Sequence, residues 1–252
     1  MPESQSQNFN HLKIHTQYSI CEGALKINDL AEFCKKNKIK GVGLSDTSNL
    51  CGALEFSENL SKSGTQPVIG TQINFKFRDY IGLLPLIATS EDSYKSIIEL
   101  SSNSYLKNNN KDDPHCQLEE LFKISKDVII LSGSINGLIG KLFNKGLTKE
   151  IEDIYLSLKK RFGYNFYIEI QRHDDFNEKI FEQFNLNVSK NLDIPIIATN
   201  EVFYLYKEMH DAHDALICIG NKTYLNEKNR IKYSNNHYFK TDDEMEKIFS
   251  DL

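Results

Sequence analysis

The stretch HLKIHTQYSICEGALKINDLAEFCKKNKIKGVGLS, residues 11–45, holds two strand patterns with a helix pattern between them. Residues 11–15 and 41–45 are short and rich in apolar side chains, as strands are. Residues 27–38 place apolar side chains at helical spacing, and Asn28 is a suitable cap at their start. A strand, a helix and a strand in succession are typical of a parallel unit, so this stretch predicts an α/β fold.

The same alternation continues through most of the chain. Further strand patterns cover 67–75, 81–88, 128–133, 165–171 and 194–200, and further helix patterns cover 91–106, 118–124, 147–162, 177–192, 207–220 and 242–252. One pair of strands, 67–75 and 81–88, is close enough in sequence to be antiparallel. Seven strands of this kind predict a closed or nearly closed β/α barrel, with a doubly wound open sheet as the alternative.

We expect a single domain over residues 1–252. Its barrel core covers about 9–203, and a helical extension follows over 204–252. The polar, Asn-rich stretch 101–115 is predicted to be a loop that leaves the barrel. The final helix pattern has an apolar stripe, from which we expect the natural polypeptide to continue beyond Leu252.

Composition narrows the class of protein. Charged residues make up 26% of the 252 residues and the net charge is −5, which argues against disorder and against a generally basic, nucleic-acid-binding surface. The five cysteines are scattered without a C-x-x-C pair, a pattern that favours reduced thiols in the cytoplasm. No apolar run has the length of a membrane span, so we expect a cytoplasmic protein without a membrane partner.

Polar side chains follow several predicted strands. Functional residues of β/α barrels gather where the strands end, and here those positions are His15, Asp46, Gln72, Ser134, His173, Asn200 and Glu201. Imidazole and carboxylate groups can bind zinc or manganese. However, Lys13 shares the face of the first strand with His11 and His15, and its ammonium opposes a cation. The residues therefore indicate a metal site only weakly.

Residues 11–56, followed by PVIGTQ, ILSGS, YIEIQRH and IATNEVFY, resemble the PHP (polymerase and histidinol phosphatase) domain found at the N-terminus of bacterial DNA polymerase III alpha subunits. The resemblance extends in order from about Phe9 to Leu252. It implies a distorted (β/α)7 barrel of the PHP type. In metal-binding members of this family, several histidines and carboxylates hold the ions.

Matched one position at a time, the family's metal ligands are mostly replaced in this chain. The first motif falls on Lys13, His15 and Glu22, and the second keeps Asp46. The positions at which a ligand is replaced are Lys13, Thr47, Gln72, Leu83, Ser134 and Phe203. The remaining plausible ligands are His15, Glu22 and Glu201. The pattern is similar to the degenerate PHP domains of many proteobacterial polymerases.

The resemblance has consequences for function. It implies a domain without a cofactor or catalytic residue of its own, which supports the polymerase and docks the proofreading exonuclease subunit. The Mg²⁺ ions of the polymerase reaction would belong to other domains of the alpha subunit, and direct DNA binding would be weak at most. Two alternatives remain open. One is a metal-dependent 3′–5′ exonuclease or phosphoesterase that uses His15, Glu22, Asp46, His173 and Glu201, and the other is a binding module unrelated to replication.

The same positions lead to expectations about contacts. We expect Lys13 to take the place of the metal and to pair with one or more of Glu22, Asp46 and Glu201. His15 is predicted to hydrogen-bond Asp46 or Glu201. His173 is predicted to lie on the rim of the pocket. His11 is expected to pack at the start of its strand, and the histidines at 210 and 213 are expected to be structural.

Overall fold

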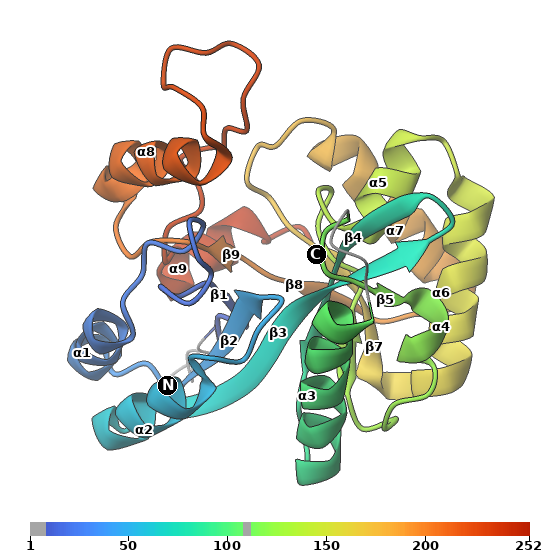
Figure 1. Ribbon diagram of the computed structural model, residues 1–252, viewed down its shortest axis with the longest axis horizontal. Coiled ribbons are helices and arrows are strands. Elements are labelled where there is room, and N and C mark those ends of the chain that lie inside the picture. Colours follow the sequence, from blue (N-terminus) through green and yellow to red (C-terminus); the bar gives the residue numbers. More distant parts are fainter. Residues whose placement is uncertain (1–8, 108–111) are drawn as a thin grey trace, which may run out of the picture.

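One curled sheet organises the protein, whose computed structural model describes residues 9–107 and 112–252. Its strands are β1 (Lys13–Ile14), β2 (Gly41–Thr47), β3 (Gln66–Phe77), β4 (Tyr80–Ile87), β5 (Cys116–Gln117), β6 (Ile129–Leu131), β7 (Phe166–Ile170), β8 (Ile196–Ala198) and β9 (Glu201–Val202). They follow the order β8-β7-β6-β4-β3-β2-β1-β9, with β5 beside β3. The two ends of this order, β8 and β9, are separated by only two residues, so the sheet curls back on itself (Figure 1).

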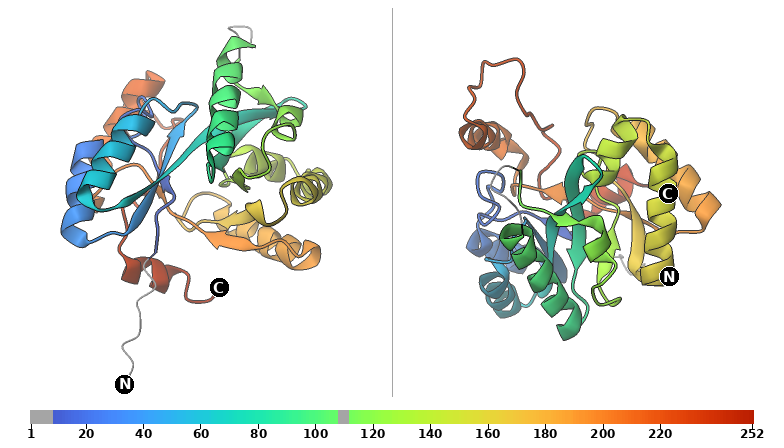
Figure 2. Two further views of the ribbon diagram at one scale, coloured as in Figure 1. Left: turned by 90° about the horizontal axis from the view of Figure 1, so that it is seen from below. Right: turned by 45° about the vertical axis from the view of Figure 1, so that its right-hand side comes forward.

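Helices cover the outside of the curled sheet. They are α1 (Ile27–Asn37), α2 (Ala53–Ser63), α3 (Glu91–Leu106), α4 (Leu118–Leu121), α5 (Leu138–Asn144), α6 (Thr148–Phe162), α7 (Glu178–Leu192), α8 (His210–Asn221) and α9 (Asp242–Ile248), with 3-10 turns η1 (Gly163–Asn165) and η2 (Lys207–Met209). Helices α1 and α2 flank one side, and α5, α6 and α7 flank the other (Figures 1 and 2). The predicted α/β barrel of the distorted PHP type is confirmed, and the open-sheet alternative is wrong.

Side-chain alternation explains why the inside of the barrel is polar. Ile14 and Val202 point outward into an apolar core beneath α1 and α2, whereas their neighbours Lys13 and Glu201 point inward. On β7, Ile168 and Ile170 join a second apolar core beneath α5, α6 and α7. The residue between them, Glu169, faces Lys13.

The hairpin of β3 and β4 is the longest regular pairing in the described chain. It runs antiparallel from Gly70 opposite Ile87 to Phe77 opposite Tyr80, as predicted. Strand β4 is also antiparallel to β6, while β1, β2, β7, β8 and β9 pair in parallel. The hairpin therefore interrupts an otherwise parallel barrel and distorts it.

Several local predictions are wrong. Helix α3 confirms the helix predicted over 91–106, so the loop predicted over 101–115 begins too early; residues 108–111 of that loop lie outside the described residues. Helices α2 and α5 were not predicted. Asn28 does not cap α1, because the helix begins one residue earlier, at Ile27. The N–H of Ile27 donates a hydrogen bond to the side chain of Gln17 at 2.9 Å.

The segment after residue 203 packs on the barrel. Tyr204 and Tyr238 form an isolated parallel bridge, and Phe239 is buried in the core beneath α1. Arg172 binds Glu182 at 2.6 Å and Asp251 at 2.6 Å, which fastens the end of the α9 region to α7. In the described part of the chain, no helix is both long and apolar enough to cross a membrane.

Candidate functional site

The inward-facing residues of neighbouring strands meet at one end of the barrel. In the register of β1 and β9, Lys13 lies opposite Glu201, and in that of β2 and β3, Thr47 lies opposite Gln72. Parallel strands end at the same edge, so these side chains and His15 converge there. The structure thus brings together five of the positions predicted for the pocket: Lys13, His15, Thr47, Gln72 and Glu201.

Glu201 is the hub of this cluster. Its Oε1 atom accepts a hydrogen bond from Gln72 at 2.6 Å and from His15 Nε2 at 3.0 Å, and it lies 3.3 Å from the ammonium of Lys13. Burial alone would raise the pKa of Glu201. The charge of Lys13 and the bonds from His15 and Gln72 outweigh burial and hold this pKa well below its usual value. Glu201 is therefore ionised throughout the neutral range.

Lys13 lies between two carboxylates and is fully buried. Its Nζ atom is 3.2 Å from Glu169 Oε1 and 3.3 Å from Glu201 Oε1. Burial lowers the pKa of Lys13, but the two carboxylates outweigh burial and raise it, so the ammonium stays charged. The predicted pair with Glu201 is confirmed. The prediction named one or more of Glu22, Asp46 and Glu201, and Glu201 is the one that pairs; the carboxylates of Asp46 and Glu22 have other partners.

Asp46 holds the turn that follows β1 instead. One of its oxygens accepts from Thr16 N at 2.6 Å and from Ser19 Oγ at 2.8 Å, and the other accepts from Thr16 Oγ1 at 2.8 Å. Glu22, on the same turn, accepts a short hydrogen bond from Thr47 Oγ1. These bonds fold residues 16–23 over the end of the barrel.

His15 links the hub to this turn. Its Nε2 donates to Glu201, and its Nδ1 lies 3.2 Å from Ser19 Oγ, whose own proton is donated to Asp46. Each ring nitrogen thus has an oxygen within hydrogen-bonding distance, and Nε2 also lies 2.9 Å from the amide nitrogen of Gln72. Burial lowers the pKa of His15, but the bond to Glu201 and the nearby carboxylates outweigh burial and raise it. The predicted bond to Glu201 is confirmed, whereas Asp46 is reached only through Ser19.

His173 belongs to a second buried group beside the hub. The rim position predicted for it is wrong, because His173 is buried and stacks on His237 at 4.1 Å with an angle of 5° between the rings. Its Nε2 atom lies 3.2 Å from the backbone N–H of Glu201. Burial, together with the charges of His237 and Lys240, holds the pKa of His173 well below 6.5.

Four further residues that the sequence singled out have local structural contacts. Phe203 is buried, and its ring packs against that of His15 at 4.6 Å. Ser134 lies after β6, where its hydroxyl accepts from Asn136 N at 3.3 Å. His11 is buried and its Nε2 donates to Lys240 O at 2.8 Å, as expected for a structural residue. His213 is likewise structural, since its Nε2 donates to Glu22 O at 2.8 Å.

Glu169 is the site residue that sequence reasoning missed. Besides pairing with Lys13, its Oε1 atom accepts from Gln171 at 2.9 Å and from Thr199. The signal was present in the sequence, because a glutamate stands in the middle of the apolar strand FYIEI. A charged side chain on a buried strand normally has a partner of opposite charge.

The donor set does not fit a catalytic metal. The ammonium of Lys13 lies where Glu169 and Glu201 face each other, and a cation cannot bind both carboxylates while Lys13 does. Within residues 9–107 and 112–252, no three His, Cys, Asp or Glu side chains are arranged to hold a metal ion. The negative charge of the two glutamates is balanced by protein groups.

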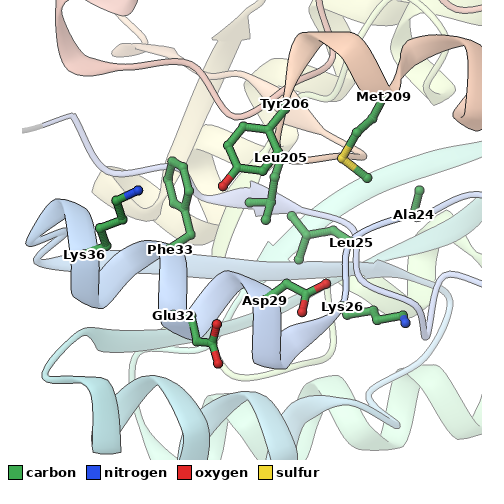
Figure 3. Close-up of a pocket in the computed structure, with 10 residues that line it drawn as sticks. All are labelled: Ala24, Leu25, Lys26, Asp29, Glu32, Phe33, Lys36, Leu205, Tyr206 and Met209. Carbon is green, nitrogen blue, oxygen red and sulfur yellow. The ribbon is translucent and has the colours of Figure 1, made fainter.

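A surface groove of about 380 Å³ lies apart from this cluster, between α1 and the segment that leads into α8. Figure 3 shows Phe33 of α1 next to Tyr206, with Leu205 and Leu25 to their right along the groove. The aromatic rings meet edge to face at 5.9 Å. None of the residues of the polar cluster lines this groove.

Comparison with known proteins is consistent with this geometry. The family model described as the PHP domain matches residues 11–173. The chain is 32% identical to a DNA polymerase III subunit alpha of Caulobacter vibrioides, over 100% of this chain and 23% of that protein. It is 37% identical to that of Rickettsia conorii, over 97% of this chain and 21% of that protein. The chain thus spans about a fifth of the length of these relatives.

One solved structure gives a more distant comparison. An amidohydrolase from Chromobacterium violaceum with bound sulfate and no metal shares 8% identity, with 77% of this chain and 87% of that chain covered and a TM-score of 0.49. The family assignment rests on the sequence match, which covers more than half of the chain and includes β1 to β7. The chain belongs to the PHP domain family.

Proposed function

We propose that this chain serves as the PHP domain of a replicative DNA polymerase III alpha subunit and has a structural role without hydrolytic activity of its own. The similarity to curated alpha subunits along the whole chain supports the first part. Polymerase chemistry, with its Mg²⁺ ions, would be carried out by other domains of such a subunit in the cytoplasm.

One observation carries the structural role. The buried ammonium of Lys13 pairs with Glu169 and Glu201, at the end of the barrel where the family's metal ligands fall. An ammonium can balance carboxylates, but it cannot coordinate a water molecule and lower its pKa as a metal does. Asp46 and Glu22 are also engaged, by Thr16 and Thr47 respectively.

The proposal includes docking of the proofreading exonuclease subunit. A domain that tethers an editing enzyme beside the polymerase raises the local concentration of that enzyme at the primer end, so even a modest interface is useful. Hydrolysis within the PHP domain is then dispensable, because editing is supplied by the partner.

Metal analysis combined with a nuclease assay tests the catalytic part. After dialysis we expect less than one equivalent of zinc or manganese per chain, and no release of nucleotides from a 3′-labelled oligonucleotide when Mn²⁺ is added. Two or more bound equivalents together with activity that Asp46→Asn abolishes would instead support a phosphoesterase. Titration with the exonuclease subunit tests the docking part separately.

A further inference from the structure

A small cavity lies between α7 and the end of β7. It is formed by residues 133–135 after β6, residues 169–171, and side chains of α7 between 178 and 185. Its volume is about 10 Å³, at the lower end of the roughly 10–15 Å³ that one water molecule requires. Most of the side chains that line it are polar, and polar cavities of this size hold water whereas apolar ones stay dry.

Asn185 of α7 lines this cavity and carries a hydrogen-bond donor without a partner. Its side chain is fully buried, and its Nδ2 atom has no hydrogen-bond partner within residues 9–107 and 112–252. Its Oδ1 atom accepts from the phenol of Tyr155 at 3.0 Å. Burial raises the pKa of Tyr155 well above its usual value, so the phenol keeps its proton and can donate it. This bond fixes the orientation of the Asn185 amide and leaves Nδ2 as the atom without a partner.

Glu169 lines the same cavity and carries an acceptor without a partner. Its Oε1 atom is engaged by Lys13, Gln171 and Thr199. Its Oε2 atom is buried and, in the described part of the chain, accepts no hydrogen bond. The Nδ2 atom of Asn185 can only donate and the Oε2 atom of Glu169 accepts, yet the two atoms do not bond each other directly. The cavity thus has one donor and one acceptor that complement each other but do not meet.

A chain of hydrogen bonds already connects these two side chains on their other sides. The backbone N–H of Glu169 donates to Ser132 Oγ at 2.9 Å, and the hydroxyl of Ser132 is bonded to the phenol of Tyr155. Tyr155 in turn donates to Asn185. The charge of Glu169 contributes to the raised pKa of Tyr155, so this carboxylate lies near the phenol. A group that accepts from Asn185 and donates to Glu169 would close the chain into a ring.

We propose that this cavity is a binding site for one internal water molecule, which accepts a hydrogen bond from Asn185 Nδ2 and donates one to Glu169 Oε2. Buried polar atoms in native proteins almost always have a partner, and internal water supplies the partners that protein groups do not reach. A metal cation does not fit, because it has no proton to donate and the amide hydrogens of Asn185 would repel it. The water completes the hydrogen bonds of the carboxylate that pairs with Lys13.

A crystal structure of the chain, at a resolution that shows ordered solvent, tests the proposal directly. We expect one peak of electron density within about 2.7–3.2 Å of both Asn185 Nδ2 and Glu169 Oε2. A cavity without density would overturn the proposal, and so would a closed cavity in which these two atoms bond each other. A peak surrounded by oxygen atoms at roughly 2.3–2.6 Å, with Nδ2 turned away from it, would indicate a cation and would also overturn the proposal.

Magnetic relaxation dispersion of the water oxygen nuclei, which detects long-lived internal water in solution, provides the second test. Asn185→Leu replaces the amide by an apolar side chain of similar size and should remove the contribution of one water molecule. Tyr155→Phe is the matched control, since it removes a hydroxyl from the same chain of bonds but leaves the amide in the cavity, and it should keep that contribution. The double variant leaves no phenol without an acceptor and serves if Asn185→Leu alone does not fold. Equal dispersion in the wild type and in the folded Asn185 variant would overturn the proposal.

Discussion

Replacing Lys13 by alanine tests the central feature of the site. The substitution removes the ammonium that lies 3.2 Å from Glu169 and 3.3 Å from Glu201, and it leaves two buried carboxylates without that charge. Removing one partner of a buried ion pair typically costs about 3–5 kcal/mol. For a domain of this size, that loss corresponds to a fall in Tm of roughly 6–20 °C.

Urea unfolding followed by circular dichroism measures the effect. Lys13→Met is the companion variant, since it keeps the length of the side chain and removes only its charge. Lys62→Ala is the control, because Lys62 pairs with Glu58 on the exposed face of α2 and should change the free energy of unfolding by less than about 1 kcal/mol. Adding Glu201→Gln to Lys13→Met should cost less than the two single changes combined, with a coupling of about 1–3 kcal/mol.

The loss of stability caused by Lys13→Ala should also depend on pH. The folded-state pKa of Glu201 lies below its unfolded value, so its contribution is present above an unfolded pKa of about 4.3 and is lost as pH falls through the folded pKa. Removing Lys13 abolishes much of that contribution. The difference between wild type and variant should therefore be largest at neutral pH and shrink in acid. A loss below about 1 kcal/mol at pH 7, or one that is independent of pH, would refute the buried ion-pair account.

Three further predictions follow from the same contacts. The pKa of the His15 ring, measured by NMR, should lie above 6.5, and a midpoint below 6.5 would contradict this. The stability that a charged His15 contributes should be present below the unfolded pKa and should be lost as the pH rises through the raised folded pKa. Arg172→Ala should cost about 1–2 kcal/mol and speed hydrogen exchange in α9, whereas the control Lys247→Ala should leave that exchange unchanged. Because the net charge is −5, single-stranded DNA should bind with a Kd of about 10⁻⁴ M or weaker at physiological salt, and submicromolar binding would contradict this.

Local sequence patterns predicted most of the helices and strands, because each of these elements is formed by residues that are neighbours in the sequence. The apolar spacing of residues 147–162 lies within one stretch, and α6 covers 148–162. The hairpin of β3 and β4 was predicted because only a short turn separates two apolar runs. Helix α2 also has local signals, with Ala53, Phe56 and Leu60 buried and Gly64 in the left-handed conformation at its end. It was overlooked because its polar residues outnumber the apolar ones.

Long-range pairing could not be predicted in the same way. The strand predicted over 194–200 contains β8, which pairs with β7. The separate strand β9 (Glu201–Val202), which pairs with β1, lies beyond that range and was not predicted. Nothing in the local sequence shows that the chain passes there from one edge of the sheet to the other. This break is what places Glu201 opposite Lys13.

The same limit explains the partners of Asp46. Its carboxylate was one of three expected as possible partners of Lys13. Instead, residues 16–23 fold back, with Cys21 at a φ of 60°, and bring Thr16 and Ser19 to Asp46. Such a turn depends on backbone geometry that strand alternation does not encode.

The charges of the site support the proposed structural role by a physical argument. The ammonium of Lys13 lies between Glu169 and Glu201, and His15 lies within hydrogen-bonding distance of Glu201, so protein groups surround these two carboxylates. A metal ion in such a place would keep open positions for water or a substrate oxygen. Lys13 instead has no exposed surface, and both nitrogens of His15 face protein oxygens. Groups engaged in this way stabilise the barrel, which is the role that we propose for them.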